Sequence, residues 1–147
     1  MKDMPQRLML TPVPKQFVDA IWEQVANVLR KSVATAAGKV EVNDVYDGIM
    51  SDEYVLWIVV DYGIGDEIIA AITTKLIEYP QCKAMSMDWI GGTRMKEWLP
   101  MVQETISRYA TEHGCSHLEG YGRKAWGRWL EKYGWKPDYI AYKMELE

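Results

Sequence analysis

The sequence predicts an α/β protein of the α+β type, in which about four helices pack on one mixed sheet. Apolar residues recur at helical spacing in four segments, while β-branched and aromatic runs typical of strands lie between them. Glycine and proline mark most of the boundaries. At 147 residues the chain suits one domain, residues 1–147, with its own core. The expected order of elements is βααβββαβαβ.

The first third of the chain predicts a strand followed by two helices. "RLMLTPV" (7–13) is a short apolar strand that proline closes. From Lys15 onward apolar residues follow helical spacing until Gly38 ends the helix. "VNDVYDGIMSD" (42–52) predicts a second, shorter helix, with Asn43 or Asp44 as its N-cap.

The middle of the chain predicts the centre of the sheet. "EYVLWIVVDY" (53–62) is β-branched, aromatic and almost continuously apolar. The turn residues "GIGD" (63–66) separate it from "EIIAAITTKLIEYP" (67–80), so the two strands should form a hairpin. "CKAMSMDWIGG" (82–92) adds a third member to the sheet.

The last third predicts a helix, a strand, a helix and a closing strand. The helix Met95–His113 contains Pro100, so it either starts again there or kinks. "SHLEGYG" (116–122) is the next strand, and "RKAWGRWLEKYGW" (123–135) is the last helix. "DYIAYKMELE" (138–147) alternates strongly between apolar and polar residues and predicts a strand.

The last helix has two different faces. An apolar stripe with spacings of three and four consists of Trp126, Trp129, Leu130 and Tyr133. Positive residues on another face are Lys124, Arg128, Lys132 and Lys136. The pattern suits a helix with one buried and one solvated side. The alternative is a phosphate-binding rim, to which Arg123 at the start of the helix would contribute.

Charge and cysteine content exclude several classes of function. A net charge of −4 and a pI near 5.3 disfavour duplex binding, so we expect no sequence-specific nucleic-acid partner. No run approaches the ~20 apolar residues that cross a membrane. Two isolated cysteines suit a reducing, cytoplasmic compartment. His113, Cys115 and His117 lack an evident fourth ligand, so no metal is expected.

The order of elements resembles the GNAT fold of acyl-CoA-dependent N-acetyltransferases. "MDWIGG" is similar to the central strand of that family, and "GCSHLEGYG" to its next strand. "WLEKYGWK" is similar to its closing signature, with Glu131, Lys132, Gly134 and Trp135 in place. The resemblance implies a mostly antiparallel twisted sheet, acetyl-CoA as cofactor and acetyl transfer to an amine.

The cofactor loop departs from the family pattern, which is Gln/Arg-x-x-Gly-x-Gly/Ala. This chain has "IGGTRMKEW" at that place. The resemblance implies cofactor-binding roles for Ile90, Gly91, Gly92, Thr93, Arg94, Arg123 and Lys124. Backbone N–H groups at the start of the following helix would face the pyrophosphate. Because bulky side chains replace the second glycine pair, we expect acetyl-CoA to bind more weakly than ~10 μM.

The catalytic residues of the family are also changed. A tyrosine that protonates the leaving thiolate in many members is Leu130 here, and an upstream asparagine is Arg123. Asp88 on the central strand is a candidate base. Glu119 and Tyr121 alternate with Leu118 and Gly120, so they share a face and are further candidates.

Two functions of different class therefore remain. One is a divergent acetyltransferase that acylates an amine. The other is a non-catalytic interaction or structural protein on the same scaffold, for which a bacteriophage origin, in the host cytoplasm or the virion, is an expectation from resemblance. Seven Trp and nine Tyr against one Phe suit a surface that binds a protein partner.

Overall fold

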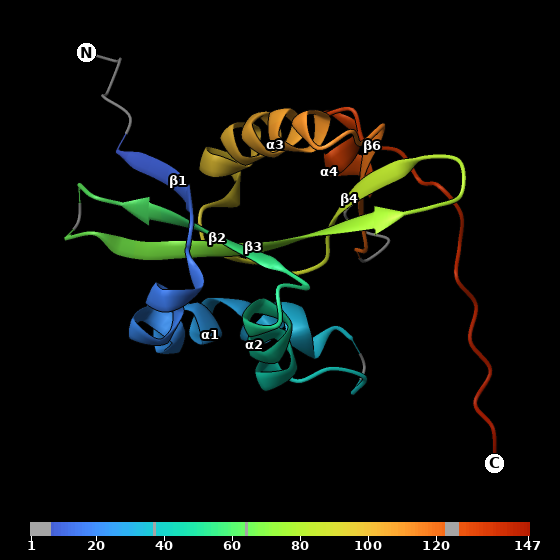
Figure 1. Cartoon of the computed structure of the whole chain (residues 1–147), viewed down its shortest axis with the longest axis horizontal. Coiled ribbons are helices and arrows are strands. Elements are labelled where there is room, and N and C mark those ends of the chain that lie inside the picture. Colours follow the sequence, from blue (N-terminus) through green and yellow to red (C-terminus); the bar gives the residue numbers. More distant parts are fainter. Residues whose placement is uncertain (1–6, 37, 64, 123–126) are drawn as a thin grey trace.

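The computed structural model describes residues 7–36, 38–63, 65–122 and 127–147. One sheet lies between two helical layers, with α1 and α2 on one face and α3 and α4 on the other (Figure 1). The described residues form six strands and four α-helices in a mixed, mostly antiparallel arrangement. This confirms the predicted fold class.

The sheet is built around its longest strand. The strands are β1 (Leu8–Pro12), β2 (Val55–Asp61), β3 (Glu67–Glu78), β4 (Lys83–Met87), β5 (Ile90–Gly92) and β6 (His117–Gly120). Their order is β1-β2-β3-β4-β6, and β5 also pairs with β3. The pairings are antiparallel except that of β4 with β6, which is parallel. The predicted hairpin is β2–β3.

The helices are α1 (Val18–Ala34), α2 (Val42–Met50), α3 (Met95–Glu112) and α4 (Gly127–Glu131), and a single 3₁₀ turn (Lys15–Phe17) precedes α1. The predicted N-cap of α2 is wrong. Glu41 is the N-cap, and its N–H donates to Asp44 Oδ2 (2.8 Å). Asp44 therefore caps from inside the first turn, as in a capping box. Pro100 lies inside α3, which begins at Met95.

Two apolar clusters pack on the two faces of the sheet. On β2, Leu56 and Ile58 join the cluster under α1 and α2, while Trp57 and Val59 join the cluster under α3. Successive strand residues point to opposite faces, so a continuously apolar strand fills both cores. That accounts for the unbroken apolar character of 55–60.

The C-terminal prediction is wrong. Residues 138–147 form no strand, and their large apolar side chains are exposed. A strand needs a neighbour for its backbone groups, and the described chain supplies none here. The segment runs away from the body as an extended trace, red in Figure 1.

The last helix is shorter than predicted. It spans Gly127–Glu131, and residues 123–126 of the prediction lie outside the described chain. Trp129, Leu130 and Tyr133 are half-buried and pack against the cluster under α3. The side of this helix that was predicted to be buried is thus the side that packs on the core. Its apolar residues are only partly buried there, and not largely buried as expected.

Candidate active site

The site candidates gather where two parallel strands end. Along β4 and β6 the last paired residues are Met87 and Gly120. Asp88 and Tyr121 follow directly, so they leave the sheet at neighbouring strand ends. Carboxyl ends of parallel strands are a common place for functional side chains. Both residues are predicted site candidates, and the register of β4 with β6 brings them to neighbouring strand ends.

A β-bulge lies between β4 and β5, both of which pair with β3. Residues 87–89 lie opposite only Thr73 and Thr74 of β3, because Lys75 pairs with Ser86 and Ile72 pairs with Ile90. The Thr73 N–H donates to the Trp89 carbonyl (2.9 Å) within this bulge. The chain then continues as β5 along β3, whereas the chain after β6 leaves towards α4. One edge of β5 therefore has no strand beside it among the described residues.

Asp88 lies half-buried at the bulge. Its carboxylate accepts a hydrogen bond from Ser86 Oγ, and Ser86 itself is buried. The neighbouring Trp89 donates from Nε1 to the Tyr54 hydroxyl (3.4 Å). Burial raises the pKa of Tyr54, and the negative charge of Asp88 raises it further. Tyr54 thus stays a neutral phenol beside the carboxylate.

Tyr121 is also held as a neutral phenol. Its pKa is raised first by desolvation and then by the carboxylates of Asp88 and Glu119, although 76% of the residue is exposed. A neutral phenol carries a proton that it can donate to a developing anion. The two carboxylates oppose formation of the phenolate that such a donation leaves. Neither Tyr54 nor Lys75, whose ammonium pairs with Glu53 (2.8 Å), was named from the sequence.

Glu119 is tied into a separate chain of hydrogen bonds. The Tyr79 hydroxyl donates to its carboxylate, with 2.8 Å to the nearer oxygen, and this bond raises the pKa of Tyr79 to about 12. His117 Nε2 lies 2.9 Å from Glu119 Oε2, and Ser116 Oγ lies 2.9 Å from His117 Nδ1. The carboxylate of Glu119 is therefore engaged, whereas that of Asp88 has one donor from Ser86.

The glycines of the expected cofactor loop are packed against backbone. A Cβ at Gly91 would lie 2.1 Å from the Val28 carbonyl oxygen of α1. Gly92 has φ of 140°, and a Cβ there would lie 2.2 Å from the Ile69 carbonyl oxygen. Ile90 is half-buried and pairs with Ile72. The fold itself requires these two glycines, because α1 approaches Gly91 and β3 approaches Gly92 too closely to leave room for a Cβ.

Thr93 and Arg94 already have partners. The Thr93 N–H donates to the Ile69 carbonyl (3.0 Å). Arg94, at φ of 62°, donates to Asp61 Oδ2 (2.7 Å) and to both oxygens of Glu97 (2.9 and 3.0 Å). These bonds raise the pKa of Arg94 and lower those of Asp61 and Glu97. Arg123 and Lys124 lie outside the described residues.

The surroundings fit an acyl-CoA in part. The open edge of β5 offers backbone groups to an extended amide-bearing chain, and the N-terminus of α3 offers its first N–H groups to a phosphate. Arg94 is positioned at that N-terminus, but two carboxylates share its charge. A bound pyrophosphate would have to compete with them.

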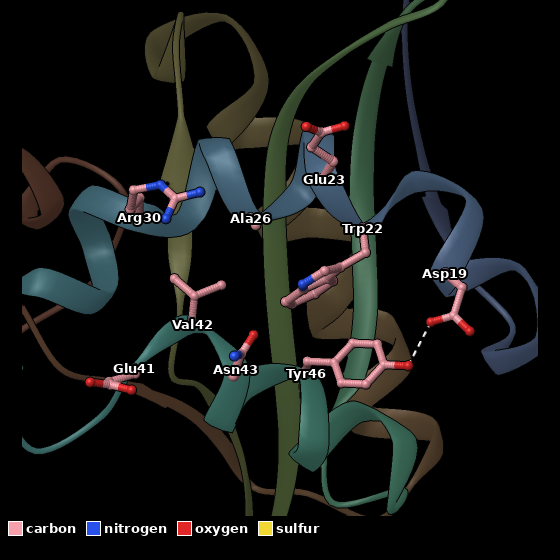
Figure 2. A pocket seen from close by; sticks show the side chains of 9 residues that line it. All are labelled: Asp19, Trp22, Glu23, Ala26, Arg30, Glu41, Val42, Asn43 and Tyr46. Atoms are coloured by element: carbon pink, nitrogen blue, oxygen red, sulfur yellow. Dashed lines mark hydrogen bonds between the residues drawn. The ribbon is translucent and has the colours of Figure 1, made fainter.

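A separate hollow of about 720 Å³ lies between α1 and α2 (Figure 2). The Tyr46 hydroxyl donates to Asp19 Oδ1 (2.5 Å), and the rings of Trp22 and Tyr46 meet edge to face at 5.1 Å. Its lining residues are Asp19, Trp22, Glu23, Ala26, Arg30, Glu41, Val42, Asn43 and Tyr46. None of the candidates from the sequence lines it. The sequence signal that could have indicated this hollow is the spacing of residues 19, 22, 23, 26 and 30, which places them on one side of a helix.

Other kinds of site are not evident in the described part of the chain. No group of three or more His, Cys, Asp or Glu side chains there is placed to hold a metal ion. Cys82 and Cys115 are free thiols. No described helix combines the length and apolar character that crossing a bilayer requires.

Comparison with solved structures identifies the fold. A GNAT family acetyltransferase from Staphylococcus aureus matches 96% of this chain and 100% of its own, with a TM-score of 0.67 and 9% identity. Glucosamine-6-phosphate N-acetyltransferase from Arabidopsis thaliana matches 97% and 100%, with a TM-score of 0.64 and 14% identity. A tetramutant of the BH1408 protein from Bacillus halodurans matches 94% and 99%, with a TM-score of 0.70 and 13% identity.

No protein-family model and no curated protein matches the sequence of this chain. The likeness thus resides in the order and packing of the elements, over nearly the whole length of each structure. The chain has the fold of the GNAT acetyltransferases.

Proposed function

We propose that the protein is an acyl-CoA-dependent N-acyltransferase that acylates an amine. The observation that carries the proposal is the divergence of β4–β5 from β6 just beyond Met87 and Gly120, with Asp88 and Tyr121 at the two strand ends. The fold shared with acetyltransferases supports it. An extended thioester lying along the free edge of β5 would bring its carbonyl to these two residues.

Asp88 and Tyr121 supply the two proton transfers that the reaction needs. The amine nitrogen forms a bond to the acyl carbon, and the carbon–sulfur bond breaks. Asp88 takes the proton that the amine loses, directly or through a water. Tyr121, kept neutral by its raised pKa, donates a proton to the departing thiolate. Tyr121 thus takes the proton-donating role that many members of the family give to a tyrosine at the position of Leu130.

Cofactor contacts are proposed for Ile90, Gly91, Gly92, Thr93 and Arg94, with added charge from Arg123 or Lys124. Arg94 is central, because its guanidinium stands at the first turn of α3. Glu97 forms its ion pair with that guanidinium from an exposed position, whereas Asp61 forms its ion pair from a buried one. A pyrophosphate would displace Glu97 more easily than Asp61. We therefore expect binding weaker than ~10 μM in the wild type.

Calorimetric titration with acetyl-CoA and with free CoA tests binding. Arg94→Ala should weaken binding, and Glu97→Gln should tighten it several-fold because the guanidinium is released. Glu104→Gln, on an exposed position of the same helix, is the matched control and should change nothing. No heat and no thermal shift at about 1 mM ligand would overturn the acyl-CoA proposal.

Product analysis by mass spectrometry, with acetyl-CoA and a panel of primary amines, tests catalysis. Asp88→Asn and Tyr121→Phe should each lower the rate by about 10²-fold or more. Both should leave acetyl-CoA affinity nearly unchanged, since neither is proposed to hold the cofactor. Full activity in both variants would remove them from the mechanism.

A second candidate is a non-catalytic protein that uses this scaffold for interaction. The specific observation in its favour is that Thr93 and Arg94 are already bonded within the chain. Binding of acetyl-CoA without turnover of any amine would favour this candidate, as would absence of binding. The bacteriophage origin stays a prediction.

A further inference from the structure

The hollow between α1 and α2 is lined by charged groups that the proposed acyl transfer does not use (Figure 2). Arg30 lies towards one end of it and Asp19 towards the other, with the ring of Trp22 between them. Its charged lining consists of three carboxylates and one guanidinium. This arrangement suits a ligand whose own charges are separated in space and whose net charge is positive.

The end near Asp19 suits an ammonium group. Asp19 and Glu23 are one helical turn apart on α1, and both line the hollow. The Tyr46 hydroxyl donates to Asp19, and this bond raises the pKa of Tyr46, so the phenol stays neutral beside the carboxylate. Glu23 is exposed and has no ion-pair partner among the described residues. Both carboxylates therefore have acceptor positions left for the N–H groups of an ammonium.

An apolar stretch lies between the two ends. Ala26 is buried and Val42 is half-buried, and both line the hollow next to the ring of Trp22. Glu23 and Arg30 are seven residues apart on α1, which corresponds to about 10 Å along the helix axis. An aliphatic stem of about four methylene groups, as in a lysine side chain, spans much of that length, and the two long side chains reach the rest.

The end near Arg30 suits a carboxylate. Within the described chain, Arg30 forms one hydrogen bond, from Nη2 to Asn27 Oδ1 (3.3 Å), so most of its donors are available to a ligand. Val42 and Asn43 are the first residues of α2, and their N–H groups have no partner inside that helix. Glu41 also lies towards this end of the hollow, where it can accept from a second ammonium group.

We propose that the hollow binds a basic α-amino acid with the length of lysine. Its side-chain ammonium meets Asp19 and Glu23, and its methylene groups lie over Trp22. Its α-carboxylate meets Arg30, and its α-ammonium meets Glu41. A ligand with two ammonium groups and one carboxylate matches a lining with more carboxylates than guanidinium groups. The inference is independent of the proposed acyl transfer, because no residue proposed for that reaction lines the hollow.

Titration of the full chain with L-lysine, followed in ¹H–¹⁵N spectra at neutral pH without acyl-CoA, tests the proposal. The indole N–H signal of Trp22, identified by its loss in Trp22→Phe, should shift saturably, together with backbone signals of 19–30 and 41–46. Norleucine lacks the side-chain ammonium of lysine, 1,5-diaminopentane lacks the carboxylate, and 6-aminohexanoate lacks the α-ammonium. Each should bind about two- to five-fold more weakly than lysine, which is the range that an exposed ion pair supplies.

Exposed substitutions assign the two ends of the ligand. Glu23→Gln should weaken lysine binding by about two- to five-fold and leave norleucine binding unchanged, because norleucine has no group for that carboxylate. Arg30→Gln should weaken lysine binding to a similar degree and leave 1,5-diaminopentane binding unchanged. Lys31→Gln is the matched control, since it removes the same charge from the next exposed position, which does not line the hollow. It should bind lysine as the wild type does.

Three results would overturn the proposal. One is the absence of a saturable shift at about 50 mM lysine. Another is equal affinity for lysine and norleucine. The third is a set of shifts centred on 86–90 that Asp88→Asn abolishes, because lysine would then bind as an amine acceptor of the proposed acyl transfer. Failure of acetyl-CoA to bind bears on the acyl-transfer proposal alone.

Discussion

Gly91 shows how a single missing side chain sets the distance between a helix and the sheet. Strand β5 lies so close to α1 that the Val28 carbonyl oxygen occupies the place where a Cβ would be. Gly92 meets the backbone of β3 in the same way. The Gly-Gly pair looked from the sequence like a phosphate loop, but its first physical role is close packing, and a cofactor role stays a prediction.

Gly91→Ala should therefore destabilise the protein by about 1–3 kcal/mol, because either α1 or β5 must shift. Gly122→Ala is the matched control, since a Cβ there meets nothing within 4 Å, and it should change the free energy of unfolding by less than about 0.5 kcal/mol. Urea unfolding measures both. Equal stability of the two variants would contradict the close approach of α1.

Arg94 links the end of β2 to the first turn of α3 through ion pairs with Asp61 and Glu97, and its effect on stability should depend on pH. Asp61 is only 1% exposed, and its pKa is lowered first by the hydrogen bond from Arg94. A carboxyl with a lowered native pKa stabilises the fold above its unfolded pKa. That stabilisation is lost as the pH falls through the native value.

The wild type should accordingly lose stability relative to Arg94→Ala as the pH falls from about 5 to 2, because Asp61 and Glu97 become protonated. At neutral pH the variant should be clearly less stable than the wild type, and the gap should narrow in acid. Chemical denaturation at a series of pH values measures the gap. Lys96→Ala is the control, and a gap that stays constant for Arg94→Ala would contradict the ion pairs.

An amide side chain of α3, that of Gln103, holds the segment that follows α4. Gln103 Nε2 donates to the Tyr133 carbonyl (2.7 Å), and Gln103 Oε1 accepts from Trp135 Nε1 (2.9 Å). The short helix α4 has no fully buried residue among those described. These two bonds therefore hold residues 133–135, which follow α4, against α3.

Gln103→Ala should cost about 1–3 kcal/mol and shift the fluorescence of Trp135 to the red, because both bonds are lost and water reaches the indole. Gln103→Glu keeps the acceptor for Trp135 but removes the donor to Tyr133, so its effect should be intermediate. Glu104→Ala, exposed on the next position of α3, should leave both signals unchanged.

At the scale of elements, the local sequence pattern predicted those helices and strands that depend only on residues close along the chain. The β2–β3 hairpin follows from two apolar strands around a glycine turn, and α3 follows from its spacing of three and four. Residues 138–147 form no strand despite their alternating pattern, because strand pairing is not a local property. The bulge at 87–89 could not be predicted from the sequence either, because it follows from the different registers in which β4 and β5 pair with β3.

The candidate site divides in the same way. Asp88, Glu119 and Tyr121 could be named from strand alternation and the family resemblance. Their environment could not, because Tyr79 reaches Glu119 across 40 positions and Arg94 reaches Asp61 across 33. Those contacts depend on the strand order, which sequence spacing alone does not determine.

The whole molecule is two apolar cores that share one sheet. Ile68 and Ala71 of β3 face the cluster under α1 and α2, whereas Ile69 and Ile72 face the cluster under α3. Strand β3 also pairs with β2, β4 and β5. Unfolding of either half would expose one face of β3 to water, although β3 is the strand on which the other half is also built.

The chain should therefore unfold in one cooperative transition, whichever core is damaged. Leu29 is a buried residue of α1, and Leu29→Ala should cost about 2–5 kcal/mol. Ile106 is a buried residue of α3, and Ile106→Val should cost about 0.5–1.5 kcal/mol. In each variant, tryptophan fluorescence and far-UV circular dichroism should give coincident urea curves at a lowered midpoint. If Leu29→Ala gave two steps, with β4, α3 and β6 still protected from hydrogen exchange after the first, the two cores would be separate folding units, and the sharing of β3 would not couple them.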